Sequence, residues 1–231
     1  MQHSQQWRLH TDSLYFTDDY MNVTVHRTGH DGTLKELLRT NGGPWGVSSV
    51  ETVVNTWLAD VFGQDTINKW KENDLQLYHM FWENIKVQGR DLSYNKTNRK
   101  TFFIGLLAKY LPTGVHDITT PFTRLNLKDN VEIYKDKLRV PAQIVRSWFD
   151  EPINKGIRHI SAVLAMPVMN DVDTILLVGE FAECLLVQET IKEAFRNKRI
   201  VIPREPRDAV LKGAVLFGHQ SRLMGKNQFD S

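Results

Sequence analysis

One stretch constrains the fold of this chain more than any other: residues 174–218, which read TILLVGEFAECLLVQETIKEAFRNKRIVIPREPRDAVLKGAVLFG. Short apolar runs alternate in it with amphipathic segments, and Gly179 directly follows the first run. This pattern predicts an α/β unit in which strand, tight turn, helix, strand and helix follow one another. Because the turn after the first strand can lie against a ligand, such units are common in nucleotide-binding α/β proteins. The predicted elements are strands at 174–178 and 199–202 and helices at 183–195 and 205–217.

The last of these helices carries small residues on one face, namely Ala209, Gly213 and Ala214. We expect this face to let the helix backbone come close to a neighbouring element.

The N-terminal part predicts a β-hairpin. Residues 20–28 alternate between apolar and polar, residues 29–32 are a turn signal, and residues 33–40 can return as the second strand. A glycine-rich loop is predicted at 41–46. The apolar residues that share one face of the first strand are Met21, Val23 and Val25.

Helical spacing of apolar residues follows this loop. It predicts a helix over about 50–61, capped by Ser48 or Ser49 and ended by Gly63. A second amphipathic helix is expected at about 65–87.

The middle of the chain is less regular. Residues 89–100 are polar and predict an exposed loop, and Pro141 opens a long amphipathic helix. Pro152 lies inside this helical pattern, so we expect a kink or a restart near Asp150. Short strands are predicted between the loop and the helix at 102–107, 124–127 and 131–134.

Composition limits the classes of function. Of 231 residues, 41% are hydrophobic, which is enough for a sizeable core, and 29 basic against 27 acidic residues leave a formal charge of +2. This balance does not predict nucleic-acid or membrane binding. A single cysteine, Cys184, excludes an internal disulfide. With no apolar signal segment at the start and no run of about 18 apolar residues, the sequence favours a cytoplasmic protein.

Several short motifs, in order, resemble the seventy-kilodalton heat-shock-protein family and in particular its divergent 12A/12B-type members. The motifs are VTVH (23–26), GTLKEL (32–37), GGPWG (42–46), SWFDEPI (147–153), LVG (177–179), FAE (181–183) and VLKGAVL (210–216). The resemblance covers about residues 20–218. It implies an actin-like ATPase fold, a mixed sheet of the RNase-H-like type flanked by helices, of which this chain matches only the second lobe.

The resemblance also implies a domain organisation. We expect a loose N-terminus at 1–19, the lobe at 20–218 with an insertion at about 65–138, and a polar tail at 219–231. The first lobe, which carries the family's first phosphate loop and catalytic lysine, has no counterpart in this sequence, so we expect a truncated chain.

The same resemblance suggests a nucleotide site for ATP or ADP with magnesium. Gly42 and Gly43 resemble the glycine pair near the terminal phosphate, although a glycine turn between strand and helix explains them equally. Glu83 and Lys86 resemble the helix that contacts adenosine, although a surface ion pair is the alternative.

Two further segments carry the same resemblance. Gly179 and Phe181 belong to the segment that resembles the family's adenosine loop. Glu180 stands where the family has a second glycine; we expect it either to take positive φ or to point to solvent. Residues 17–22 match the second phosphate loop but contain no glycine and two aspartates.

The sequence therefore predicts a divergent, chaperone-related ATP-binding protein that is impaired in hydrolysis. No catalytic residue and no metal ligand is predicted. Two alternatives remain. One is a nucleotide-free protein-interaction module, that is, a pseudo-ATPase lobe, and the other is an incomplete gene product. Protein partners are unknown at this stage.

Overall fold

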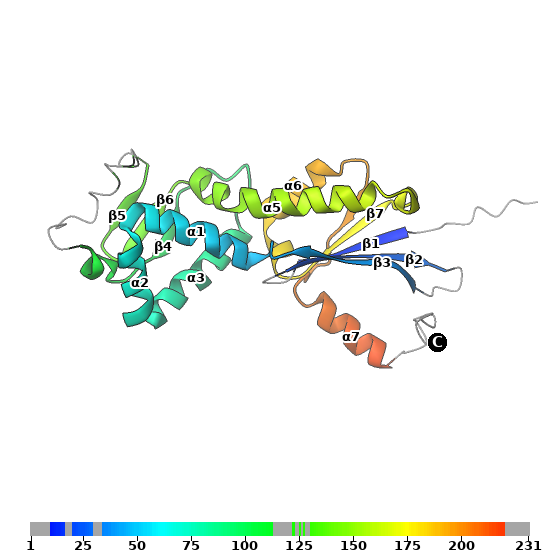
Figure 1. Cartoon of the computed structure of the whole chain (residues 1–231), viewed down its shortest axis with the longest axis horizontal. Helices are drawn as coiled ribbons and strands as arrows, with labels where there is room; N and C mark the ends of the chain where they lie inside the picture. Colours follow the sequence, from blue (N-terminus) through cyan, green and yellow to red (C-terminus); the bar gives the residue numbers. More distant parts are fainter. Residues whose placement is uncertain are drawn as a thin grey trace, which may run out of the picture. The chain divides into compact units, whose positions relative to one another are not determined.

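The computed structural model describes residues 10–16, 20–29, 34–112, 122, 125, 127 and 130–219. The chain forms two compact units. The first contains Met1–Val47, Pro152–Glu183 and Val187–Ser231, and the second contains Ser48–Glu151 and Cys184–Leu186. Each unit has a sheet of its own with helices beside it (Figure 1). The predicted mixed α/β architecture is confirmed.

A five-stranded mixed sheet forms the centre of the first unit, in the order β3-β2-β1-β7-β8. β1, β2 and β3 are antiparallel neighbours, whereas β7 runs parallel to β1 and β8 runs parallel to β7. The hairpin and both later strands are confirmed. The strands are β1 (His10–Phe16), β2 (Met21–Thr28), β3 (Leu34–Gly43), β7 (Thr174–Val178) and β8 (Arg199–Val201).

Alternation along β2 decides which side of this sheet is buried. Met21, Val23 and Val25 are at most 1% exposed, while the residues between them are partly exposed. Ile175 and Leu177 of β7 are fully buried. The part of α5 (Ala142–Leu164) that follows Glu151 lies on one side of the sheet with α6 (Leu185–Ala194), and α7 (Ala209–His219) lies on the other (Figure 1).

The helix α7 differs from its expected role. After Ala209, every described side chain of α7 is exposed, including Leu211 at 68% and Leu216 at 60%. A Cβ atom placed on Gly213 would meet no atom within 4 Å. The predicted close approach of a small-residue face is therefore wrong within the described part of the chain.

The N-terminal prediction also needs correction. His10–Phe16, expected to be loose, forms β1 and pairs with β2 on one edge and β7 on the other. A central strand has neighbours on both edges for its backbone groups, so a polar sequence such as HTDSLYF can be ordered without a long apolar run. Residues 1–9, 17–19, 30–33 and 220–231, which include the predicted hairpin turn and almost all of the predicted tail, lie outside the described residues.

Among the described residues, the second unit contains three helices, the part of α5 up to Glu151, and a small antiparallel sheet of order β4-β6-β5. Gly63, with φ of 90°, separates the first two helices as predicted. The single helix expected at 65–87 is two helices, because the chain leaves helical geometry at Asp74. Ser48 and Ser49 lie inside the first helix instead of capping it. The elements are α1 (Val47–Phe62), α2 (Gln64–Asn73), α3 (Leu75–Arg90), β4 (Lys100–Phe103), β5 (Glu132–Tyr134) and β6 (Lys137–Val140).

Of the three strands predicted in the insertion, that at 131–134 is confirmed as β5 and that at 102–107 ends at Phe103, because a short 3₁₀ turn, Leu107–Tyr110, follows. The segment 124–127 lies largely outside the described residues. No strand was predicted at β6, where Leu138 and Val140 are buried in a run of only four residues.

Aromatic side chains fill the core of the second unit. Trp70 and Phe81 are fully buried, and their ring centroids are 5.5 Å apart in an edge-to-face arrangement. Trp148 contacts Phe102 at 5.7 Å and Trp57 at 5.2 Å. Pairs of this kind stabilise by about 0.5–1.5 kcal/mol beyond their buried area. These tryptophans of the second unit therefore serve packing.

The helix α5 runs from Ala142 to Leu164 without interruption, with Pro152 inside it. Of the two expectations near Asp150, the restart is wrong because the helix is continuous, and the kink stays a prediction. Pro152 has no backbone N–H, so one helical hydrogen bond is missing there. Phe149 and Ile153 flank this position and are at most 5% exposed. Their burial offsets the missing hydrogen bond.

Two polar contacts order the second unit. Asp74, at the junction of α2 and α3, accepts hydrogen bonds from Lys109 Nζ at 2.7 Å and from the hydroxyl of Tyr110 at 2.9 Å. These bonds, that of Lys109 foremost, hold the pKa of Asp74 below its usual value.

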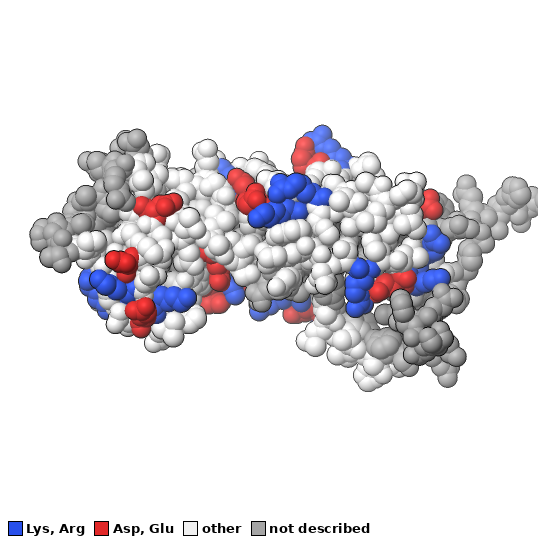
Figure 2. Space-filling view, viewed as in Figure 1, with Lys and Arg blue, Asp and Glu red and all other residues white. Residues whose placement is uncertain are grey.

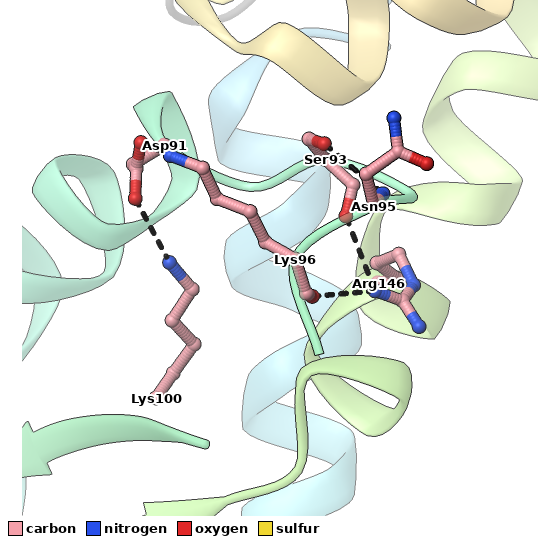
Figure 3. A network of polar contacts seen from close by, with 6 residues as sticks. All are labelled: Asp91, Ser93, Asn95, Lys96, Lys100 and Arg146. Atoms are coloured by element: carbon pink, nitrogen blue, oxygen red, sulfur yellow. Dashed lines mark hydrogen bonds and ion pairs between the residues drawn. The ribbon is translucent and has the colours of Figure 1, made fainter. Parts of the chain in front are cut away.

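The second contact orders the loop that follows α3 (Figure 3). Arg146 Nη1 donates to the backbone oxygens of Ser93 at 3.2 Å and Lys96 at 3.0 Å. Asp91 pairs with Lys96 and, at 3.6 Å, with Lys100, whose side chain is only 8% exposed. The loop predicted to be simply exposed is thus tied to α5.

On the face shown in Figure 2, acidic and basic side chains stand in small mixed groups. No broad region of one sign covers this face among the described residues. Among these residues, too, no helix combines the length and apolar character needed to cross a membrane.

Candidate functional site

Three segments that the resemblance assigned to a ligand leave the sheet of the first unit at the same end. Phe16 at the end of β1 pairs with Met21 at the start of β2, and Met21 pairs with Gly43 at the end of β3. Tyr15 pairs with Val178, the last residue of β7. In open α/β sheets, ligands bind beyond the carboxyl ends of the strands. The pairing register between the strands therefore brings the segments after residue 16, at 42–43 and after residue 178 together at the carboxyl ends of β1, β3 and β7.

The first of these segments is only partly described. Residues 17–19 lie outside the described residues, whereas Tyr20 is 53% exposed and Met21 is fully buried.

Gly42 and Gly43 are the last residues of β3, so the predicted loop begins only at Pro44. A Cβ on Gly43 would lie 2.6, 2.7 and 2.9 Å from three atoms of the Trp45 indole. A Cβ on Gly42 would lie 2.8 Å from the backbone oxygen of Met21. Both glycines are therefore required by close contacts within the first unit, and the nearest group to Gly43 is the indole.

His159 of α5 is the second side chain at this glycine pair. Its Cδ2 atom is 3.1 Å from the position that a Cβ on Gly42 would take, and its ring lies edge-on to that of Trp45 at 5.5 Å. The Nε2 atom of His159 is buried and has no hydrogen-bond partner. Burial lowers the pKa of His159, which favours the neutral ring.

The sequence analysis did not assign Trp45 or His159 to the site. An aromatic residue two positions after a glycine pair was a usable signal for Trp45. His159 carried none, because its position depends on how α5 packs against the sheet.

The turn after β7 is tightly held. Gly179 has φ of 97°, the left-handed conformation that favours glycine, and its N–H donates to the backbone oxygen of Pro206 at 2.8 Å. Phe181, in the short 3₁₀ turn Phe181–Glu183, is 2% exposed. In this structure the amide of Gly179 and the ring of Phe181 are thus engaged within the first unit.

Both expectations for Glu180 are wrong. Among the described residues other than glycine, only Lys135 has positive φ. The Glu180 side chain is 10% exposed, and its carboxylate lies 4.0 Å from the guanidinium of Arg207. The ordinary backbone conformation lets the carboxylate fold back toward this cation and away from water.

Glu83 and Lys86 lie on α3, in the second unit. Their charged groups are 3.6 Å apart, Glu83 is 72% exposed and Lys86 is 22% exposed. The structure therefore shows the surface ion pair that was one of the two interpretations. Of the six predicted nucleotide-binding residues, it brings Gly42, Gly43 and Gly179 to one end of a sheet, and it pairs Glu83 with Lys86.

The fit to the nucleotide that the resemblance implies is partial. The three glycines occupy a sheet end suited to a ligand, but the Trp45 indole takes up the space beside Gly43, and Pro206 takes up the Gly179 amide. Within the described residues, no three His, Cys, Asp or Glu side chains form a group that could hold a metal ion. Cys184 is a buried thiol.

Comparison with known proteins identifies the relatives of this chain. No family model matches it. It is 28% identical over 203 residues to heat shock 70 kDa protein 12B of Homo sapiens, and 28% identical over 202 residues to heat shock 70 kDa protein 12A of Mus musculus. Each match covers 86% of this chain, and the chain spans only 30% of the length of these relatives. The chain is therefore similar to heat shock 70 kDa proteins 12A and 12B over most of its own length, and its mixed α/β architecture agrees with part of an actin-like ATPase fold.

Proposed function

We propose that this chain is a chaperone-related lobe that binds adenine nucleotide and, by itself, does not hydrolyse ATP. The observation that carries the proposal is the meeting of three segments at one end of the five-stranded sheet. Met21 pairs with Phe16 and Gly43, and Val178 pairs with Tyr15 beside them. These are the segments in which the family resemblance locates contacts to phosphate and adenosine.

Carboxylates at these segments weaken the binding of an anion. Residues 17–22 carry Asp18 and Asp19 where the family has glycines, and Glu180 replaces another glycine. A carboxylate about 4 Å from a phosphate charge costs on the order of 4 kcal/mol at an effective dielectric constant of 20. A carboxylate this close to a bound phosphate therefore lowers affinity by orders of magnitude, although the Arg207 guanidinium 4.0 Å from Glu180 offsets part of the effect of that residue. We expect no hydrolysis because the segments that the resemblance assigns to the nucleotide are altered, with no glycine at 17–22 and Glu180 in place of a second glycine.

Calorimetric titration of the purified chain with ATP and ADP, with and without magnesium, tests binding. The proposal predicts a dissociation constant in the micromolar range and no release of phosphate over hours. Glu180→Gln removes one repelling charge and keeps the size of the side chain, so it should raise affinity by at least about tenfold. Glu193→Gln, on the exposed side of α6, is the matched control and should change nothing.

A nucleotide-free interaction module is the second candidate. The Gly179 N–H is already bonded to Pro206, and the Trp45 indole already occupies the space beside Gly43. A lobe that has lost its ligand can keep its glycines for such internal contacts. This candidate predicts no heat of binding at several hundred micromolar nucleotide for either the wild type or the Glu180→Gln variant.

Hydrolysis is tested separately. Magnesium-dependent release of phosphate that follows the chain through successive purification steps would overturn the proposed lack of activity.

A further inference from the structure

We propose that Trp45 is an internal cover on the Gly42–Gly43 backbone, so that a phosphate group reaches this backbone only after the indole has moved away. This inference rests on the proposed function, because it concerns the same end of the sheet. It adds a residue that controls access to the glycine backbone.

The distances place the indole in the space that a ligand needs. Glycine lets an anion approach backbone N–H groups because no side chain stands in the way. Here three indole atoms lie within 2.9 Å of the point where a Cβ of Gly43 would be. A phosphate oxygen and the indole therefore compete for one volume.

Local contacts hold the indole in this position. The backbone N–H of Trp45 donates to the backbone oxygen of Gly43 at 2.8 Å, which makes a tight turn and directs the side chain back over the strand end. The ring of His159 lies edge-on at 5.5 Å. Trp45 itself is only half-buried. A half-buried ring held by one aromatic neighbour can be displaced at modest cost.

The His159 ring beside Gly42 carries an unsatisfied polar atom. Buried polar side-chain atoms nearly always have a hydrogen-bond partner. Nε2 of His159 is buried without one, and the adjacent Cδ2 atom is 3.1 Å from the Cβ position of Gly42. In the tautomer that carries its proton on Nε2, this nitrogen can donate a hydrogen bond to an anion beside Gly42.

The expected size of the effect follows from population shift. If the open state is a minor one, the apparent dissociation constant rises by the inverse of its population. An aromatic pair of this geometry corresponds to roughly a 2- to 13-fold change in an equilibrium constant. Trp45→Leu, which removes the aromatic ring but remains apolar, should therefore bind phosphate-bearing ligands about 2- to 13-fold more tightly than the wild type.

The test uses the full chain labelled with 5-fluorotryptophan, titrated with ATP and with inorganic tripolyphosphate and followed by fluorine NMR and calorimetry. Trp45→Phe assigns the Trp45 resonance, because this signal disappears in that variant. The cover predicts that the Trp45 resonance shifts on binding of either probe, and that Trp45→Leu raises affinity for both. Trp57→Leu, on α1 of the second unit, is the control and should leave affinity unchanged.

The outcomes separate the two proposals. Binding to the wild type with an unshifted Trp45 resonance, or equal or weaker binding to Trp45→Leu, overturns the cover and leaves nucleotide binding intact. Binding to Trp45→Leu alone supports the cover. No binding to either form refutes nucleotide binding and the cover together. If circular dichroism shows that Trp45→Leu does not fold, two other results decide about the cover. A shift of the Trp45 resonance in the wild type and tighter binding by Trp45→Phe, whose ring is smaller, support it, and the absence of either overturns it.

Discussion

Replacing Gly43 by alanine adds a single methyl group where the structure leaves no room for it. The new Cβ atom would lie 2.6 Å from Cε2, 2.7 Å from Cζ2 and 2.9 Å from Nε1 of Trp45. Contacts below 3.0 Å essentially do not occur for Cβ atoms, so the indole must move. Overpacking of this kind typically costs about 1–3 kcal/mol. We therefore expect Gly43→Ala to lower the free energy of unfolding of the first unit by about that amount.

The same chemical change at Gly213 should have the opposite sign. Gly213 lies in the middle of α7, and a Cβ there meets nothing within 4 Å. Alanine in a helix interior is more favourable than glycine by roughly 0.5–1 kcal/mol, because it loses less backbone entropy on folding. Gly213→Ala is thus a matched control that predicts stabilisation.

Urea unfolding followed by circular dichroism measures both variants. Because the chain forms two compact units, its unfolding need not be a single transition. Hydrogen–deuterium exchange of peptides from β2 and β3 locates the effect of Gly43→Ala, and exchange of α7 peptides locates that of Gly213→Ala.

A double-mutant cycle identifies the cause. If the penalty arises from the indole, it should largely disappear when Gly43→Ala is made in the Trp45→Leu background. A Gly43→Ala protein as stable as the wild type, or a penalty that persists without the indole, would refute the reasoning about this contact.

Three further predictions follow from the polar contacts. Asp74→Asn should lower stability at pH 7 and flatten the acid side of the pH–stability curve. The lowered pKa of Asp74 means that its carboxylate stabilises the fold above about pH 3.8, and this stabilisation is lost as pH falls through the pKa of the native state. Urea titrations from pH 3 to 7 would show equal acid slopes if this is wrong. The wild type should lose stability as pH falls below about 6.5 toward the lowered pKa of His159, because in this range only the unfolded state gains the proton. His159→Phe should reduce this loss, and melting temperatures at pH 5 and 7 measure the difference. Arg146→Ala should cost about 1–3 kcal/mol and speed exchange of the amides at 91–97, because two carbonyls lose a charged donor, whereas Arg196→Ala at an exposed ion pair should change neither.

Glu180 illustrates where reading the sequence reached its limit. The sequence shows a carboxylate at a position where the family has glycine, and this observation suggested either positive φ or exposure to solvent. The structure shows neither. Arg207 lies 27 positions after Glu180 in the sequence, and only the fold brings its guanidinium to 4.0 Å from the carboxylate. A partner contributed by a distant loop leaves no local pattern.

The strand at 174–178, the hairpin, the first helix and its end at Gly63 could all be predicted, because hydrogen bonds and side-chain periodicity within a segment depend on neighbours in the sequence. The sequence by itself also carried the resemblance to heat shock 70 kDa proteins 12A and 12B. Tertiary structure alone decided that His10–Phe16 is a central strand and that the ends of β1, β3 and β7 meet. It also decided that an indole lies over Gly43. These features depend on the register between strands and on contacts between residues far apart in the chain, where each partner is specified only once the other has been placed.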